Sequence, residues 1–247
     1  MGNKRIAIGI GLVISAVFLF LAFQGLQPEA FLSSLGNVNV ALLFVGALVY
    51  FLAVAVIALR WQFLLRAVQM IPLYPLTQIV AIGYMGNNVY PLRAGEALRI
   101  YLLRRNFQVP VARATTTVVV ERVFDGLVML SFILFSLTLI DIESTEVETV
   151  ATFATPLFIT AMLIFFFLAA QPNLLRRLVK IVMSFLPEKI ATILGDISED
   201  IIAGLEGLRS PVYLLGTVIS SFVTWSIEAG VYWIVMSAFG LDLGYPV

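Results

Sequence analysis

The chain contains neither cysteine nor histidine among its 247 residues. These absences exclude disulfides, thiol nucleophiles, histidine acid–base relays, and haem or zinc sites built on either residue. Charge is scarce too, because 12% of the residues are charged, against about 25% in a typical soluble domain. In their place stand hydrophobic residues, which make up 61% of the chain and give it a mean hydropathy of +1.02. The composition therefore indicates an integral membrane protein. A metal site made only of carboxylates stays open, but no cofactor is expected.

Positive charge is missing from alternate connections between the hydrophobic blocks. Apart from Arg122, every lysine and arginine falls within residues 4–5, 60–113 or 176–209. The intervening connections carry acidic residues instead: Glu29, Asp141, Glu143, Glu146, Glu148 and Asp242. Because cytoplasmic loops hold the excess of Lys and Arg, this pattern predicts a multi-pass protein of the cell (plasma) membrane with a cytoplasmic N-terminus. The expected partners are the bilayer and its lipids, and no nucleic acid.

The hydrophobic blocks predict an all-α fold, a polytopic membrane helix bundle. Since no polar linker divides the chain, residues 1–247 form one transmembrane domain. The predicted spans are residues 6–23, 40–59, 115–140, 150–170 and 212–239. Their lengths suit a hydrocarbon core of about 30 Å. The first is interpreted as an uncleaved span rather than a secretory signal, and the second is expected to end with Arg60 and Trp61 at the interface.

Two stretches differ from simple spans. Residues 71–90 are apolar but contain Pro72, Pro75 and Gly83, which predicts a re-entrant segment broken inside the protein. Residues 173–208 show helical spacing of apolar residues on either side of Pro187. That pattern predicts two amphipathic helices on the cytoplasmic surface, serving as a connector. The final residues, 241–247, are expected to form an outside turn of a chain that continues.

The densest polar cluster lies between Gly86 and Arg99. Its candidate substrate-binding residues are Asn87, Asn88, Arg93, Glu96 and Arg99. A helix beginning at Pro91 would place the last three along one side and offer free backbone N–H groups to an anionic headgroup. Glu96 could then pair with either arginine, leaving the other to hold a phosphate. Taken alone, the motif fits equally well a loop whose charges neutralise one another.

A second cluster, Glu121, Arg122 and Asp125, falls inside the predicted span 115–140. Glu121 and Asp125 share a helix face, and Arg122 can pair with Asp125 within the helix. A charge at the bilayer centre costs at least about 2.5 kcal/mol, so these groups must pair or face water. The favoured interpretation is a polar cavity in which Glu121 or Asp125 meets Arg93 or Arg99. The alternative is that the cluster sits at the cytoplasmic interface, where burial costs little.

Glu228 is a lone acid inside the last predicted span, with Trp225 and Tyr232 at helical spacing. Such a residue could couple to protons or bind a cationic group. A hydrogen bond to another span explains it equally well. It is included among the candidate substrate-binding residues.

The runs 87–99 and 121–125 together resemble the flippase-like family, which includes the transmembrane region of lysylphosphatidylglycerol synthases. The resemblance implies an all-helical membrane domain with re-entrant segments and a cavity for lipid headgroups. It also implies movement of phospholipids or polyprenyl-linked lipids between leaflets. Two parts of the family pattern are not found before Val247: a later Pro- and Gly-rich segment followed by an acid, and a soluble aminoacyl-transferase domain.

Three functions compete. The leading hypothesis is a lipid flippase domain that binds an anionic phospholipid or polyprenyl-phosphate headgroup, with Arg93 and Arg99 as its main ligands. The alternative is a membrane-embedded lipid-phosphate transferase, with Glu121 or Asp125 as base or metal ligand, or an accessory subunit of one. The third hypothesis is an assembly or regulatory membrane subunit, in which the charges only bind helices together. The sequence favours a protein that is not an enzyme, and leaves open a homo-oligomer and a separate transferase partner.

Overall fold

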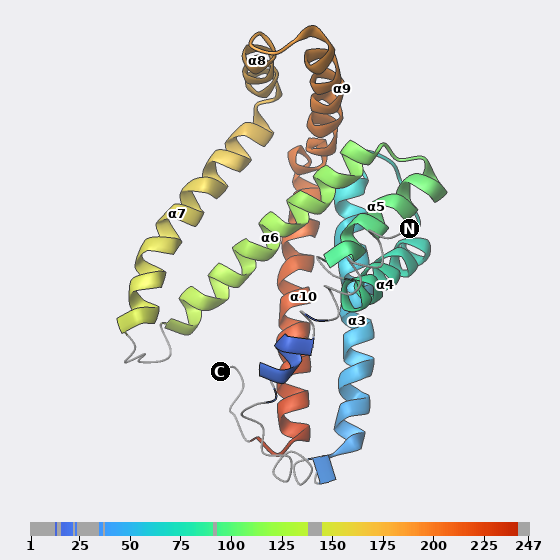
Figure 1. The fold of residues 1–247 in the computed structure, drawn as a ribbon, viewed down its shortest axis with the longest axis vertical. Coiled ribbons are helices and arrows are strands. Elements are labelled where there is room, and N and C mark those ends of the chain that lie inside the picture. The colour runs from blue at the N-terminus through green and yellow to red at the C-terminus, as the bar shows by residue number, and fades with distance from the viewer. Residues whose placement is uncertain are drawn as a thin grey trace. The chain divides into compact units, whose positions relative to one another are not determined.

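In the computed structural model, every element among the described residues is helical. The structure describes residues 38–90, 93–137 and 145–241, together with residues 13, 16–21, 23, 35 and 36. The elements are α3 (Val40–Leu65), α4 (Leu73–Val89), α5 (Ala94–Phe107), α6 (Val111–Leu137), α7 (Thr145–Ala170), α8 (Pro172–Met183), α9 (Glu188–Gly204), the short 3₁₀ helix η2 (Glu206–Arg209) and α10 (Pro211–Ala238) (Figure 1). The predicted all-α class is confirmed.

Two of these helices, α3 and α10, are long and apolar enough to cross a bilayer. A third crossing is available if residues 155–170 of α7 and the following α8, which meet at a bend of 99°, count as one broken span. The predicted span at 115–140 corresponds to α6, whose charged side chains keep it out of this set. Its crossing of the membrane therefore stays a prediction. The predicted first span, at 6–23, falls largely outside the described residues.

The chain divides into two compact units, residues 1–46 with 232–246, and residues 47–231. In the first unit the Asn39 N–H donates to the Ala238 carbonyl at 2.9 Å. Gly46 keeps α3 close to α10 there, since a Cβ at this position would lie 3.4 Å from the Ile234 side chain. All the candidate site residues belong to the second unit.

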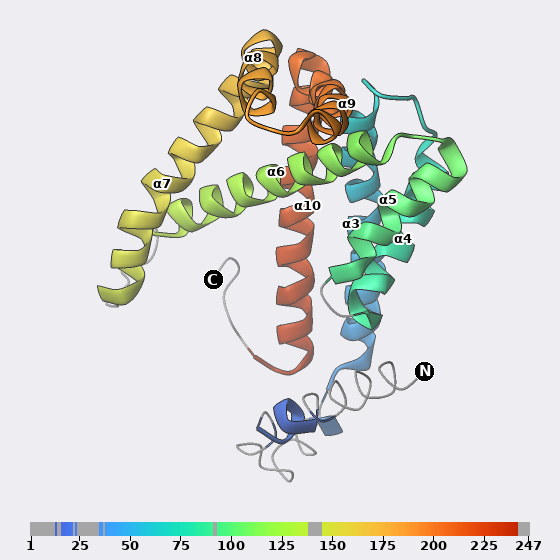
Figure 2. The same ribbon diagram turned by 45° about the horizontal axis from the view of Figure 1, so that its top comes forward.

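Within residues 71–90, the helix α4 runs without a break from Leu73 to Val89, whereas an interrupted segment was predicted. Pro72 is the N-cap of α4 and Pro75 lies in its first turn, where the missing N–H would have no acceptor in any case. The helix ends at Val89 because Tyr90 is extended (φ −101°, ψ 146°), as the residue before a proline tends to be. The chain then reverses, and α4 and α5 pack side by side as a hairpin (Figure 2). Whether this hairpin re-enters the membrane remains a prediction.

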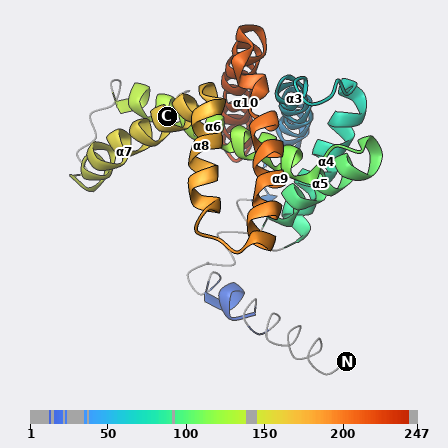
Figure 3. The ribbon, with the colours of Figure 1, turned by 90° about the horizontal axis from the view of Figure 1, so that it is seen from above.

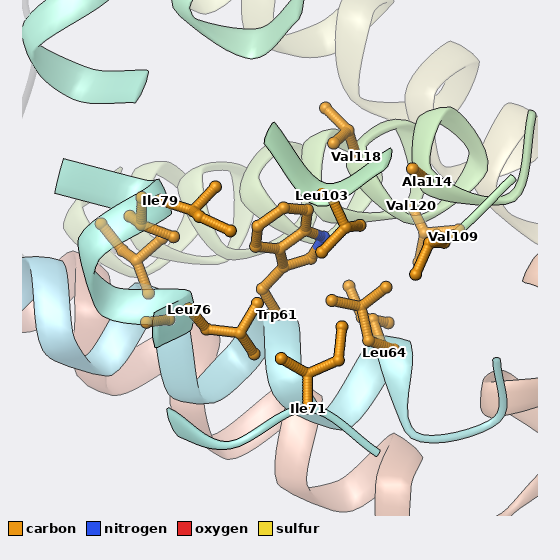
Figure 4. Packing of buried hydrophobic residues seen from close by; sticks show 14 of the residues in the cluster. Trp61, Leu64, Ile71, Leu76, Ile79, Leu103, Val109, Ala114, Val118 and Val120 are labelled. Atoms are coloured by element: carbon orange, nitrogen blue, oxygen red, sulfur yellow. The ribbon is translucent and has the colours of Figure 1, made fainter. Parts of the chain in front are cut away.

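The apolar core of the second unit is centred on Trp61 of α3, which is fully buried. Leu76 and Ile79 of α4 and Leu103 of α5 surround the indole, and α6 closes the cluster with Val118 (Figure 4). Between helices in a bilayer, side chains of this size stabilise the packing mainly through their many van der Waals contacts. The core therefore holds α3, α4, α5 and α6 together around the polar groups described below.

The predicted amphipathic region is a pair of packed helices, α8 and α9, with Pro187 at the N-cap of the second (Figure 3). Apolar side chains such as Ile181 and Ile193 are exposed on this pair. Arg176 and Glu199 join the two helices through an exposed ion pair, with Nε and Oε1 2.9 Å apart. The hydrogen bond from Arg176 lowers the pKa of the Glu199 carboxyl. The cytoplasmic position of this pair remains a prediction.

Candidate functional site

Three helices of the second unit meet at the carboxylate of Glu121 in α6. Arg99 of α5 donates to it through both amino groups, at 3.2 Å to Oε1 and 3.0 Å to Oε2. Arg60 of α3 places its Nη2 3.1 Å from Oε1. All three side chains are at most 1% exposed. This closed end of the site is a buried three-way ion pair that ties α3, α5 and α6 together.

The other end of the site reaches the surface of the unit. Arg122 contacts Glu121 and also places its Nη1 3.0 Å from Asp125 Oδ2. Its Nε lies 3.6 Å from Glu96 Oε1 of α5. Side-chain exposure rises to 38% for Arg122 and 28% for Glu96. We call the Arg122–Glu96 pair the open end of the site. Its longer contact leaves room for exchange with a ligand.

The charged network is defined here as six residues: Arg60, Glu96, Arg99, Glu121, Arg122 and Asp125. Its three guanidinium groups and three carboxylates balance in charge. Asp125 links the two ends, because Arg60 and Arg122 both pair with it. An unpaired charge in a membrane-embedded helix would cost several kcal/mol, so this balance allows the network to exist in the bundle.

Aromatic side chains complete the coordination of the network. The Arg99 guanidinium lies over the Trp61 ring, 4.2 Å from its centroid, a favourable cation–π geometry. The Trp61 Nε1–H donates to Thr117 Oγ1 at 3.0 Å. On α10, Trp225 Nε1 donates to Asp125 Oδ1 at 3.0 Å. The Trp61 indole thus presents its apolar body to the core, and both indole N–H groups are satisfied.

Arg99 can be buried because glycines let α4 and α5 approach closely. A Cβ on Gly83 would clash with the Arg99 side chain, and one on Gly86 would lie 3.1 Å from the Gly95 Cα. A Cβ on Gly95 would overlap the Gly83 carbonyl oxygen. The α4–α5 crossing therefore forms the wall along which the Arg99 stem runs to reach Glu121.

Each arginine of the network keeps one donor without a hydrogen-bond partner among the described residues. These donors are the Nε groups of Arg60, Arg99 and Arg122. Buried donors without acceptors are costly and call for an explanation. Those of Arg60 and Arg99 belong to side chains sealed from solvent, whereas Arg122 lies at the open end. The Nε of Arg122 is itself buried and lies 3.6 Å from Glu96 Oε1, so an acceptor can reach it once the Glu96 side chain moves aside.

Several sequence predictions describe this geometry. The structure contains the Arg122–Asp125 pair within α6 and the meeting of Glu121 with Arg99 across the bundle. Glu121 and Asp125 face the same neighbour, since both contact Arg60. Glu96 pairs with Arg122 rather than with either arginine of its own segment. The three-residue spacing favoured a local pair, but the packing of α5 on α6 supplies a different partner.

Arg93 does not share a helix face with Glu96 and Arg99, so that prediction is wrong. Arg93 is the N-cap of α5 in the left-handed conformation (φ 53°, ψ 42°), and its side chain is exposed, with no ion pair to a described residue. The predicted helix start at Pro91 lies outside the described residues. Among them, α5 begins at Ala94.

The two asparagines before the turn have modest contacts. Asn88 is exposed and donates from Nδ2 to the Tyr84 carbonyl at 3.1 Å. Asn87 is half-buried, and its Oδ1 has no partner within the described part of the chain. Gly95 packs against Asn87, since an added Cβ would lie 2.7 Å from that oxygen. Both asparagines thus lie on the α4 side of the hairpin, apart from the ion pairs of the network.

Glu228 of α10 lies within electrostatic range of Asp125, Arg60 and Arg122 and is half-buried. It is therefore a neighbour of the charged network rather than an isolated acid. Including it would give the site a surplus of one negative charge. This placement fits either role considered from the sequence.

Sequence reasoning missed Arg60, which was expected at the membrane interface. The structure buries it completely, because α3 continues to Leu65 instead of ending at Leu59. A signal for this was present: the residues after Arg60 include Trp61, Phe63 and Leu64, so the apolar pattern does not stop at the arginine. A charge inside a continuing apolar helix marks a buried partner rather than a boundary.

With this geometry described, comparison with known proteins identifies the family. The family profile of the lysylphosphatidylglycerol synthase TM region matches residues 8–247, so the chain belongs to this family. The chain is 24% identical over 266 residues to glycosyltransferase AglD of Haloferax volcanii, covering 98% of this chain and 43% of that protein. It is 28% identical over 127 residues to the UPF0104 membrane protein MJ1595 of Methanocaldococcus jannaschii, covering 50% of this chain and 38% of that protein.

The chain spans less than half the length of these two relatives. No solved structure matches it with statistical significance. Family membership and the helical fold establish a lipid-related membrane protein. The glycosyltransferase activity in the name of AglD is a property of that protein.

Proposed function

We propose that this domain binds the headgroup of an anionic phospholipid or polyprenyl-phosphate-linked lipid and moves it between the leaflets of the membrane. The observation that carries the proposal is the gradient of exposure along the charged network. Arg60, Arg99 and Glu121 are sealed, whereas Arg122 and Glu96 are about one-third exposed, at 38% and 28%. Such a site can exchange ligands at one end without exposing the buried charges at the other.

Arg122 is the main ligand-binding arginine in this proposal, in place of the Arg93 and Arg99 favoured by the sequence. Both amino groups of Arg99 are committed to Glu121, and its side chain is 1% exposed. The buried Nε–H of Arg122 makes no hydrogen bond to a described residue, and its 3.6 Å contact with Glu96 is loose enough to be exchanged. A headgroup phosphate would accept from this donor and displace Glu96, forming a charge-assisted hydrogen bond in a partly desolvated site. Glu96 would take the guanidinium back when the headgroup leaves.

The first turn of α5 also favours an anion at this point. Glu96 is the acidic residue of that turn, where the helix dipole stabilises negative charge. A phosphate that displaces Glu96 would face the same partial positive charge and the free N–H groups of the turn. Arg93, exposed at the N-cap, and Asn88 would provide the outer contacts of an approaching headgroup. Glu228 would act on the opposite side, toward any cationic group of the lipid.

The test is headgroup translocation in vesicles that contain the purified chain and a fluorescent anionic lipid. Arg122→Gln is expected to reduce the initial rate at least tenfold, since charge-assisted hydrogen bonds of this kind contribute about 1.5–3 kcal/mol. Arg104→Gln is the matched control, because Arg104 is exposed on α5 and donates only to the nearby Gln108 carbonyl. Equal rates in the two variants, with both folded, would reject the proposal.

A second candidate function is the lipid-handling part of a transferase that acts on lipid phosphates. The similarity to glycosyltransferase AglD favours it, since this chain corresponds to 43% of that protein. Here the open end would hold the acceptor lipid phosphate while another protein or domain supplies the sugar. The test measures sugar transfer to lipid phosphate in a membrane extract from which this protein has been removed. The purified protein is then added back to the extract. Restored sugar transfer to lipid phosphate that depends on Arg122 would support this role over translocation.

A further inference from the structure

An apolar cavity lies away from the charged network, between α6, α7 and α9. Its volume is about 580 Å³, within the range of about 300–1,000 Å³ found for ligand pockets. Six of its lining residues define it here as the α6–α9 cavity: Ala112, Val119, Val120, Phe165, Ile197 and Ile201. Val119, Ile197 and Ile201 are exposed, at 51%, 41% and 38%, so the cavity opens to the surroundings of the protein.

The cavity walls offer nothing that would hold a polar ligand. Thr115 and Thr116 are the polar side chains among those that line it. Both hydroxyls donate to carbonyls of their own helix, at 2.8 Å to Val111 and 2.9 Å to Ala112. A cavity with such walls excludes water and accepts hydrocarbon. In a membrane protein, the abundant molecule of that chemistry is a lipid chain.

A charged pair stands beside the cavity on two of the same helices. Arg113 of α6 donates from Nε to Asp200 Oδ1 of α9 at 2.8 Å. Their side chains are 37% and 30% exposed. No described residue accepts from the two terminal amino groups of Arg113, so these remain free for an anion. Apolar walls beside a partly exposed guanidinium match a molecule with a hydrocarbon chain and a negatively charged head.

The backbone at the inner side of the cavity is closely packed. A Cβ on Gly204 of α9 would lie 2.8 Å from the Thr116 Cβ and 3.3 Å from the Arg113 carbonyl oxygen. The two helices therefore touch here, and the cavity lies beside the contact. This close crossing holds the cavity and the Arg113–Asp200 pair at a constant spacing.

We infer that the α6–α9 cavity binds one hydrocarbon chain of an anionic membrane phospholipid, whose phosphate is held by Arg113. This site is separate from the charged network and does not depend on lipid translocation. Its occupant stabilises the junction of α6, α7 and α9 from the bilayer side. Asp200 keeps Arg113 in position and leaves its amino groups for the phosphate.

The experiment uses the full chain in vesicles of zwitterionic phosphatidylcholine that contain a photoactivatable phospholipid with a diazirine near the end of one acyl chain. After illumination, mass spectrometry of peptides locates the attached lipid. With phosphatidylglycerol as the probe, the label is expected on α6 and α9 around the cavity. Ala112→Phe fills the cavity and is expected to reduce that label about tenfold, while Ala161→Phe on the exposed face of α7 leaves it unchanged. Label spread evenly over all exposed helices, or unchanged by Ala112→Phe, overturns the inference.

The headgroup part is tested with a photoactivatable diacylglycerol, which has the same acyl chains and no phosphate, as the probe in place of phosphatidylglycerol. The unsubstituted chain is expected to prefer phosphatidylglycerol by roughly tenfold, the value of a charge-assisted hydrogen bond. Arg113→Gln is expected to abolish the preference while the chain label remains. Equal labelling by both probes in the unsubstituted chain overturns the inference. If Ala112→Phe does not fold, Val119→Trp fills the cavity from its exposed side and is judged by the same outcomes.

Discussion

Removing the negative charge of Glu121 perturbs the charged network at its most buried point. Glu121→Gln keeps the size of the side chain but leaves Arg60 and Arg99 without their shared carboxylate. Arg60 keeps Asp125 as a partner. Arg99 has no second carboxylate among the described residues, and only the Trp61 ring remains beside it. The substitution therefore strands one buried cation, Arg99, and weakens the pairing of two others, Arg60 and Arg122.

The expected loss of stability is large. Breaking a buried ion pair by removing one partner costs about 3–5 kcal/mol, because the other charge stays buried and uncompensated. For a chain of this size, each kcal/mol lowers Tm by roughly 2–4 °C. Glu121→Gln is therefore expected to lower Tm by roughly 6–20 °C. Adding Arg99→Met should recover part of this loss, since it removes the stranded cation and keeps the packing.

The measurement is thermal unfolding of the purified protein in detergent, followed by light scattering and intrinsic fluorescence. Glu199→Gln is the matched control: it makes the same chemical change in an ion pair that is exposed, where little stability is at stake. Its Tm is expected to stay at that of the unsubstituted chain. If Glu121→Gln melted no earlier than Glu199→Gln, the network would not hold the helices together as described.

Two further substitutions test the packing around the network. Gly95→Ala places a methyl group against the Gly83 carbonyl and is expected to cost about 1–3 kcal/mol of stability. The control Gly230→Ala meets no atom within 4 Å and should maintain or raise Tm. If both variants melted at the same temperature, α4 and α5 would not cross at Gly83 and Gly95. Trp225→Phe removes a donor to Asp125 and is expected to cost about 1.5 kcal/mol, seen as a lower Tm. An unchanged Tm would show that this hydrogen bond contributes nothing.

Much of the helical fold could be predicted from the sequence. Long apolar runs identified α3 and α10, the second in spite of Glu228, and the change of pattern at Pro187 identified the boundary between α8 and α9. These features depend on local composition and periodicity, which a single sequence contains. The interruption expected at Pro75 and Gly83 was wrong, because proline in a first turn and glycine at a helix crossing break nothing.

The site was predictable in its members more than in its pairings. Glu121, Arg122 and Asp125 stand out because charges inside an apolar helix need partners. The Arg122–Asp125 pair and the meeting of Glu121 with Arg99 were predicted, but single-sequence spacing does not reveal that Arg60 of α3 contacts both acids. Arg60 was assigned to the interface because it follows a run long enough to cross the membrane. The family resemblance identified the relevant segments but did not distinguish the sealed Arg99 from the accessible Arg122.

The most direct test of the central claim is protection of the open end by lipid. The chain has no cysteine of its own, so Glu96→Cys provides a single thiol beside Arg122, and Ala97→Cys provides an exposed control on the next residue of α5. Both are treated with a water-soluble maleimide in vesicles of phosphatidylcholine, with and without an anionic phospholipid. The anionic lipid is expected to slow the labelling of Glu96→Cys several-fold relative to Ala97→Cys. Labelling of both thiols at rates that the anionic lipid changes equally would contradict headgroup binding at Arg122.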